Sequence, residues 1–205
     1  MLMSLAYGAL LISALFAALQ LQRHANTQPD GPKATLQATA LSALFLAIWS
    51  LSELISRSDS IAGTDIATLQ RLLSNLAYFV ALPFFATALL ISARHSHWER
   101  PAWGRWLIGL FALFELLRRM QHGELYTQIV AVAVPAAMLL AVWSQSRAQL
   151  RGTTLLATAN MAIALLLMGP GALLTNPLFD HPFLYPLFLA ATLPLSAIAI
   201  KQSVR

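Results

Sequence analysis

Residues 114–126, FELLRRMQHGELY, place charged side chains in a part of the chain whose flanks are apolar enough to cross a lipid bilayer. Four polar residues of this segment are spaced at i, i+3, i+4 and i+7, namely Glu115, Arg118, Arg119 and His122. On an α-helix this spacing brings all four side chains to one face. Ionisable groups at membrane depth are costly, and they usually face the interior of a bundle or a water-filled cavity. The segment therefore predicts a membrane helix with one polar face.

The composition is that of an integral membrane protein. Of the 205 residues, 58% are hydrophobic and only 10% are charged, and the mean hydropathy is +0.67. Soluble domains carry about 25% charged residues, so a soluble domain of this size is excluded. The net charge is +5, but the basic residues lie in short connections, where they contact anionic lipid head groups rather than nucleic acid. Because the chain has no cysteine, disulfides and thiolate metal sites are excluded.

Seven apolar segments are candidates to cross the hydrocarbon core, which takes about 20 residues. They run approximately over Leu2–Leu21, Thr35–Ile55, Leu69–Ala93, Trp103–Met120, Leu125–Trp143, Thr153–Leu174 and Phe183–Ile200. The first of them lacks a basic leading region, so we expect it to be retained as a span and not cleaved as a signal peptide. The connections are short. We therefore predict an all-α fold, a single domain over residues 1–205, in which seven transmembrane helices form one bundle.

Basic residues predict the orientation of this bundle, because cytoplasmic connections are enriched in lysine and arginine. With the N-terminus outside, nine fall on the cytoplasmic side: Arg23, Lys33, Arg94, Arg100, Arg105, Arg147, Arg151, Lys201 and Arg205. Four fall on the outer side: Arg57, Arg71, Arg118 and Arg119. The expected topology is N-terminus outside and C-terminus cytoplasmic, in a membrane such as the bacterial inner membrane.

Polar stripes in three further spans lie at the same predicted depth as the 114–126 segment. The second span carries Trp49, Ser52, Glu53, Ser56 and Arg57, and the third begins with Arg71, Ser74, Asn75 and Tyr78. The fifth begins with Glu124, Tyr126 and Gln128. The sets of the second and third spans have helical spacing, and the polar residues of the fifth span stand at its outer end. We therefore expect the second, third and fourth spans to enclose a polar pocket in the outer half of the bundle, with support from the fifth.

The charges of the fourth span also have a simpler explanation. Long arginine side chains can snorkel back to the interface from inside the membrane, and this explains at least one of Arg118 and Arg119. Glu115 is shorter and one turn deeper, so snorkelling explains it less well. The two arginines stand at i+3 and i+4 from Glu115, where they can pair with it within the helix.

Catalytic and cofactor motifs are missing from the sequence. It contains no nucleophile elbow, zinc-protease helix or phosphate-binding loop. No histidine falls in the middle of a span, so we expect neither a metal nor a haem cofactor. Lys201 stands only at the end of the last span, which gives no support to a retinal Schiff base. An enzyme is not expected, since Glu115 and His122 are the only plausible acid–base pair.

In topology and apolar texture the chain resembles the seven-helix sensor regions that precede bacterial signalling domains, with a tryptophan near the end of the second span and a proline in the third. No output domain follows before Arg205. The resemblance implies a sensor that acts through a separate membrane or cytoplasmic signalling partner.

Our first hypothesis is a ligand-binding, receptor-like membrane module for an anionic or zwitterionic small molecule or lipid. The predicted ligand-binding residues are Glu53, Arg57, Arg71, Asn75, Tyr78, Glu115, Arg118, Arg119, His122 and Tyr126. A small transporter or channel subunit, and a structural subunit of a larger membrane complex, are the alternatives. An open cavity that reaches Glu115 and Arg118 would favour binding, whereas carboxylates paired with arginines in a closed core would favour the structural role.

Overall fold

The computed structural model describes residues 1–57, 64–174 and 181–204, and within these ranges the secondary structure is helical without strands. Arg205, which the charge asymmetry includes, lies outside the described residues. The helices are α1 (Leu2–Ala25), α2 (Asp30–Ser56), α3 (Thr64–Leu76), α4 (Leu82–Ala93), α5 (Arg100–Arg119), α6 (Gly123–Ser144), α7 (Ala148–Ile163) and α8 (Leu184–Ser203). Short π-helical segments η1 (Ala77–Ala81) and η2 (Ala164–Met168) continue α3 into α4 and extend α7. The all-α prediction is confirmed.

Each predicted apolar segment corresponds to one continuous helix of the described chain. Six of these helices are long and apolar enough to cross a membrane, one fewer than predicted, as far as the described residues extend. The helix that falls short is α5. It carries Arg100, Arg105, Glu115, Arg118 and Arg119 within its 20 residues, which lowers its mean hydropathy below that of its neighbours.

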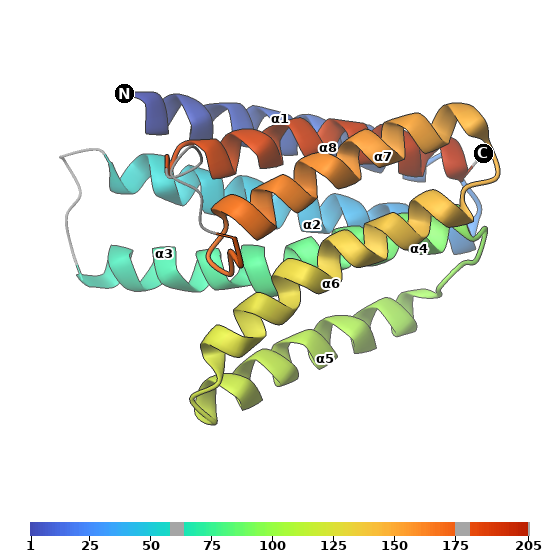
Figure 1. Cartoon of the computed structure of the whole chain (residues 1–205). Coiled ribbons are helices and arrows are strands. Elements are labelled where there is room, and N and C mark those ends of the chain that lie inside the picture. The colour runs from blue at the N-terminus through green and yellow to red at the C-terminus, as the bar shows by residue number, and fades with distance from the viewer. Residues whose placement is uncertain (58–63, 175–180, 205) are drawn as a thin grey trace.

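The six apolar helices form a closed ring. Helix α1 packs against α2 and α8, α8 against α7, α7 against α6, α6 against α4, and α4 against α2. Helix α5 lies outside this ring, where it touches η1, α2 and α6. Only Trp103 and Leu110 of α5 are buried. Figure 1 shows α5 diverging from the bundle toward its C-terminal end.

Close packing within the ring depends on small residues and on hydrogen bonds between helices. Alanines are buried along the contact of α1 with α2 and α8, including Ala14, Ala17 and Ala43. The Ser50 hydroxyl donates to the Tyr7 carbonyl oxygen, and the Ser13 hydroxyl donates to the carbonyl oxygen of Ala190. Membrane helices associate through such small-residue contacts and polar links, because lipid gives them no hydrophobic drive to pack.

The π-helical segments precede prolines. Pro83 has no backbone N–H, and its ring collides with the carbonyl group four residues earlier, that of Phe79. A wider turn at η1 accommodates that collision inside one long helix, as π-helical insertions commonly do. The second segment, η2, runs directly into Gly169 and Pro170, where the helix ends. Both interruptions therefore have local causes in the sequence.

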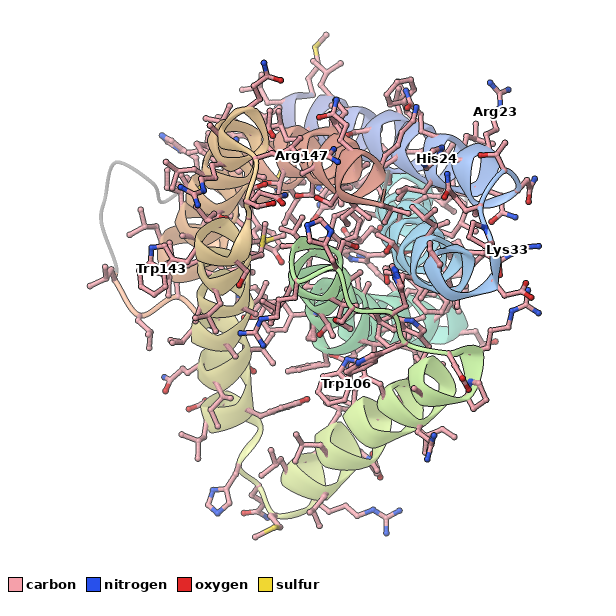
Figure 2. All side chains as sticks on the ribbon, turned by 90° about the vertical axis from the view of Figure 1, so that its right-hand side faces the viewer. Arg23, His24, Lys33, Trp106, Trp143 and Arg147 are labelled. Atoms are coloured by element: carbon pink, nitrogen blue, oxygen red, sulfur yellow. The ribbon has the colours of Figure 1, made fainter. Side chains whose placement is uncertain are left out.

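The two ends of the bundle carry different side chains. The C-terminal ends of four helices lie at the end of the bundle that holds the C-terminus of the chain, opposite the N-terminus (Figure 1). These helices are α1, α4, α6 and α8. Figure 2 looks onto this end and shows Arg23 and His24 of α1, Lys33 of α2 and Arg147 at the start of α7. Three of the basic residues predicted to share one side of the membrane, Arg23, Lys33 and Arg147, thus lie at the same end of the molecule.

Candidate functional site

The structure divides the ten predicted ligand-binding residues among three places. Glu53 and Arg57 lie at the end of α2, beside α1. A second group lies along α3, η1 and the start of α6: Arg71, Asn75, Tyr78 and Tyr126. The third group lies at the end of α5 and in the turn that follows: Glu115, Arg118, Arg119 and His122.

Glu53 is buried at the end of α2, with 8% of its surface exposed. One nitrogen of the Arg57 guanidinium donates to a carboxylate oxygen of Glu53 at 3.4 Å. The same guanidinium lies 5.3 Å from the centre of the Tyr7 ring, within cation–π range. One turn deeper, the Trp49 ring contacts those of Tyr7 and Tyr185, at 5.6 and 6.2 Å between ring centres. The charged pair of α2 therefore lies beside Tyr7 of α1, next to a cluster of aromatic rings from α1, α2 and α8.

A small cavity lies next to this aromatic cluster. It has a volume of about 20 Å³ and is lined by Leu46, Trp49, Ser74, Ala77, Tyr78, Leu82, Pro170 and Tyr185. Such a space holds about one water molecule. The Trp49 indole N–H is buried and has no hydrogen-bond partner among the described residues. A water molecule in this cavity would accept a hydrogen bond from that N–H group. The cavity has no room for a larger ligand.

Glu115 pairs with both arginines of its own helix. The Nε and Nη2 atoms of Arg118 donate to the two carboxylate oxygens at 2.9 and 2.8 Å, which is a bidentate arrangement. The Nε of Arg119 donates to one of the same oxygens at 2.9 Å. Both arginines are exposed. The predicted pairing at i+3 and i+4 is confirmed, and it lies on the periphery of the molecule.

An apolar groove lies between α5 and the ring. It has a volume of about 240 Å³ and is lined by residues of α4, α5 and α6: Pro83, Ala86, Thr87, Trp106, Leu110, Leu113, Tyr126, Ile129, Val130, Ala133, Val134 and Ala137. An α-helix turns by about 100° per residue, so Glu115 lies about 200° around α5 from Leu113. Glu115 and its arginines therefore face away from this groove.

Tyr126 is the predicted residue that does line the groove. Its ring stacks on Phe79 at 5.0 Å, and only 3% of its surface is exposed. Its hydroxyl group is buried and finds no hydrogen-bond partner in the part of the chain that the structure describes. A buried hydroxyl without a partner costs about 1–3 kcal/mol. Sites for small molecules are commonly apolar cavities that hold a few polar groups of this kind.

The Tyr78 hydroxyl group already has a hydrogen-bond partner within the protein. Its hydroxyl donates to the backbone carbonyl oxygen of Thr127 at 3.0 Å, which joins η1 to α6. Arg71 is exposed on α3, Asn75 is half-buried, and His122 is exposed in the turn after α5. Among the described residues no cluster of three His, Asp or Glu side chains could hold a metal ion.

Several residues of the aromatic cluster and of the groove were not predicted from the sequence as site residues. Tyr7 and Tyr185 complete the cluster around Trp49, and a lone tyrosine inside an apolar run was the only available signal for each. Ala86 and Ala133 line the groove, and their apolar side chains look like ordinary lipid-facing or packing residues. Which helix each of them meets depends on contacts between distant segments.

Replacing Arg118 by alanine should leave folding intact. Arg119 still donates to the Glu115 carboxylate, and exposed ion pairs contribute little to stability. We expect normal expression and an unfolding midpoint in detergent that is unchanged within error. Loss of the folded protein would contradict the peripheral position of the pair and would place Glu115 against another buried surface.

A search of protein-family models, of curated proteins and of solved structures finds no match for this chain.

Proposed function

We propose that this chain is a receptor-like membrane protein that binds a lipid-like molecule in the groove between α4, α5 and α6. The observation that carries the proposal is the Tyr126 hydroxyl, which is buried without a partner among the described residues in an otherwise apolar groove. A molecule with one hydrocarbon chain and one hydrogen-bonding group, such as a fatty acid, would fill the groove and engage this hydroxyl. It would enter from the bilayer or from its outer surface.

The proposal includes a topology with seven helices across the membrane. Helix α4 ends and α6 begins at opposite ends of the bundle (Figure 1), so α5 carries the chain from one end to the other. Its 20 residues extend about 30 Å, which equals the thickness of the hydrocarbon core. The basic end in Figure 2 would face the cytoplasm, with the N-terminus outside, in a membrane such as the bacterial inner membrane.

Helix α5 is the element through which binding would be transmitted. Of its residues, only Trp103 and Leu110 are buried, so it can shift at lower cost than the helices of the ring. A ligand moves such an equilibrium only if it binds one position of α5 more tightly than the other. Contacts with Trp106, Leu110 and Leu113 would supply that difference. The receptor would then act through a partner protein that meets the outer side of α5.

A bromine-labelled stearic acid tests the groove directly. Trp106 lines the groove, so a bound brominated chain should quench its fluorescence, saturably, in the full-length protein in neutral detergent. Ala133→Leu fills the groove and should abolish the saturable phase. Ala136→Leu is the matched control, because Ala136 is also exposed on α6 but is outside the described lining of the groove. Equal quenching in both variants would exclude this groove as the binding site.

Replacing Tyr126 by phenylalanine should stabilise the free protein and weaken ligand binding together. The change removes a buried hydroxyl that the described residues leave unsatisfied, which should raise the free energy of unfolding by about 1 kcal/mol. Affinity for the brominated probe should fall about five-fold, the value of one hydrogen bond. Detergent unfolding and the quenching titration measure the two effects.

Tyr78→Phe is the control for this prediction. Its hydroxyl already donates to the Thr127 carbonyl oxygen, so its removal should lower stability by about 1 kcal/mol and leave probe binding unchanged. Destabilisation by Tyr126→Phe as well would mean that protein or ordered water satisfies the Tyr126 hydroxyl, and the observation behind the proposal would be lost.

A structural subunit of a larger membrane complex is the second candidate. The observation that favours it is charge pairing: Glu53 pairs with Arg57, and Glu115 with both of its neighbouring arginines. Such pairs need no ligand. Absence of saturable probe binding, together with co-purification of a stoichiometric membrane partner, would favour this role over the receptor.

A further inference from the structure

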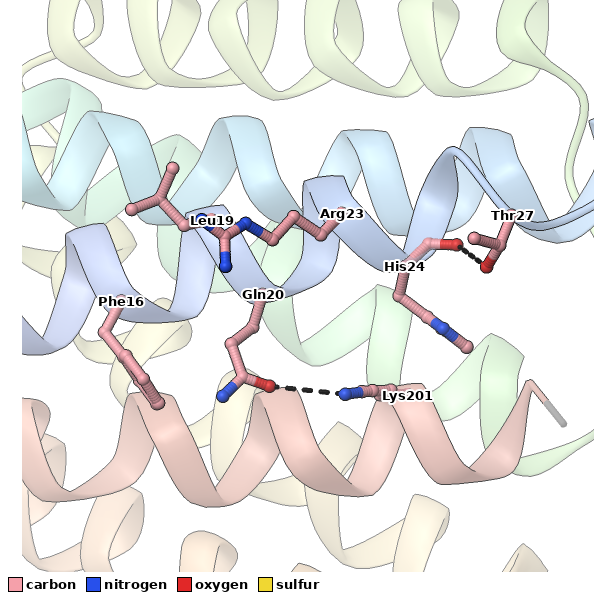
Figure 3. Close-up of a pocket in the computed structure, with 7 residues that line it drawn as sticks. All are labelled: Phe16, Leu19, Gln20, Arg23, His24, Thr27 and Lys201. Atoms are coloured by element: carbon pink, nitrogen blue, oxygen red, sulfur yellow. Dashed lines mark hydrogen bonds between the residues drawn. The ribbon is translucent and has the colours of Figure 1, made fainter.

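A second pocket lies at the basic end of the molecule, between the C-terminal parts of α1 and α8. It has a volume of about 460 Å³ and is lined by Phe16, Leu19, Gln20, Arg23, His24, Thr27 and Lys201. Figure 3 shows Gln20 and His24 of α1 pointing toward α8, which carries Lys201. We propose that this pocket binds an anionic phospholipid of the leaflet at that end, with the lipid phosphate between Arg23 and Lys201.

The charge of the pocket favours an anion. Among the described residues that line it, Arg23 and Lys201 are cationic and none is a carboxylate. The Lys201 ammonium donates to the side-chain oxygen of Gln20 at 3.4 Å, so its contact is with a neutral group. This differs from Arg57, Arg118 and Arg119, whose charges are opposed by Glu53 or Glu115. The positive charge between α1 and α8 thus remains available to a phosphate.

The apolar part of the pocket favours a lipid over a free anion. Phe16 and Leu19 are 50% and 57% exposed on α1. Phe16 stands two turns before Arg23, which is about 10 Å along the helix axis. Cationic and polar groups therefore lie at the end of the helix, and an exposed apolar strip continues from them toward the middle of the bundle. A phospholipid has the same order, with its phosphate at the interface and its acyl chains below.

The walls of the pocket are held in place by contacts that do not involve it. At the end of α8, the Gln145 side-chain amide donates to the Ser203 hydroxyl at 2.8 Å, and Arg147 donates to the Gln202 carbonyl oxygen at 3.0 Å. Deeper in the bundle, Ser13 of α1 donates to the carbonyl oxygen of Ala190 in α8. The two cations are therefore carried by helices whose relative positions are fixed, which lowers the entropy lost on binding.

Thermal unfolding of the full-length protein in neutral detergent tests the proposal. Phosphatidylglycerol, phosphatidylcholine with the same acyl chains, and inorganic phosphate are titrated separately. We expect phosphatidylglycerol to raise the unfolding midpoint saturably, and the other two to have much smaller effects. Arg23→Gln and Lys201→Gln should each weaken the phosphatidylglycerol effect about five-fold, the value of one basic residue near an anionic lipid. Lys201→Arg should restore it.

Arg105→Gln is the matched control, because Arg105 is an exposed basic residue near the same end of the molecule that bonds only to the Pro101 carbonyl in the described structure. It should leave the lipid effect unchanged. Equal stabilisation by phosphatidylcholine would overturn the proposal, as would an equal loss in Arg105→Gln. Inorganic phosphate as effective as the lipid would also overturn it, by identifying a site for free anions. The groove variant Ala133→Leu should keep the phosphatidylglycerol preference, which separates this site from the groove.

Discussion

Replacing Gly171 by alanine is expected to lower the free energy of unfolding by about 3 kcal/mol, because the added methyl group has no space. A Cβ atom at this position would lie 2.4 Å from the Thr127 carbonyl oxygen and 2.8 Å from the Tyr78 hydroxyl. The Thr127 oxygen belongs to the backbone of α6 and accepts the Tyr78 hydrogen bond. The clash can be relieved only by moving α6 away from η1 or from the turn after η2. Unfolding in detergent, followed by tryptophan fluorescence, measures the loss.

Gly109→Ala is the control for this prediction. Gly109 lies within α5, and a Cβ atom there would meet no described atom within 4 Å apart from its chain neighbours and the backbone of its own helix. Alanine in a helix is more favourable than glycine by about 0.5–1 kcal/mol, so this variant should be neutral or slightly stabilised. Similar unfolding midpoints for Gly171→Ala and Gly109→Ala would contradict the close approach of Gly171 to α6.

Hydropathy located the helices well and their ends poorly. The second span was expected over residues 35–55, whereas α2 covers Asp30–Ser56, and the sixth was expected over 153–174, whereas α7 and η2 end at Met168. Hydropathy marks the part of a helix that lipid surrounds, and helices continue into the interface with polar residues. The early end of the sixth helix has a different cause, since Gly169 and Pro170 terminate a helix although apolar residues follow.

The sequence also predicted the ion pairs within α5, but it did not predict where these pairs lie relative to the other helices. The pairing of Glu115 with Arg118 and Arg119 depends on spacings of three and four residues, and helix geometry brings side chains at these spacings together. Their distance from Glu53 and Tyr126 depends on how the helices are arranged around the bundle. Helical periodicity identifies the polar face of a helix but not the neighbour it meets. Nothing in the 114–126 segment indicates that α5 stands outside the ring.

Contacts between distant segments account for most of what was missed. The aromatic cluster joins Tyr7, Trp49 and Tyr185 from the first, second and last helices. The second pocket joins Arg23 to Lys201. Both require α1 to lie beside α8, which closes the ring. A sequence of apolar segments with short connections constrains which helices are neighbours along the chain, but it leaves open which non-consecutive helices meet. Both proposed binding sites depend on that arrangement.

Replacing Arg57 by alanine should lower the free energy of unfolding by about 3 kcal/mol, the lower end of the range for breaking a buried ion pair. Glu53 is 8% exposed and loses its charged partner at 3.4 Å. The lower end applies because a third of the Arg57 side chain is exposed, so solvent already weakens the pair. Loss of the cation–π contact with Tyr7 adds to the effect. Unfolding in detergent at neutral pH measures it.

The double variant Glu53→Gln, Arg57→Ala distinguishes a stranded charge from lost packing. Glutamine keeps the shape of Glu53 without its charge, so the double variant should recover most of the stability that Arg57→Ala loses, since the main penalty is an unpaired buried carboxylate. If it recovers none, the Arg57 contribution is packing against Tyr7. If Arg57→Ala alone changes little, the guanidinium is not needed to compensate the buried Glu53 carboxylate, and the prediction is contradicted. An aqueous path to Glu53 would produce that outcome, and it would favour an open outer pocket over a closed structural core.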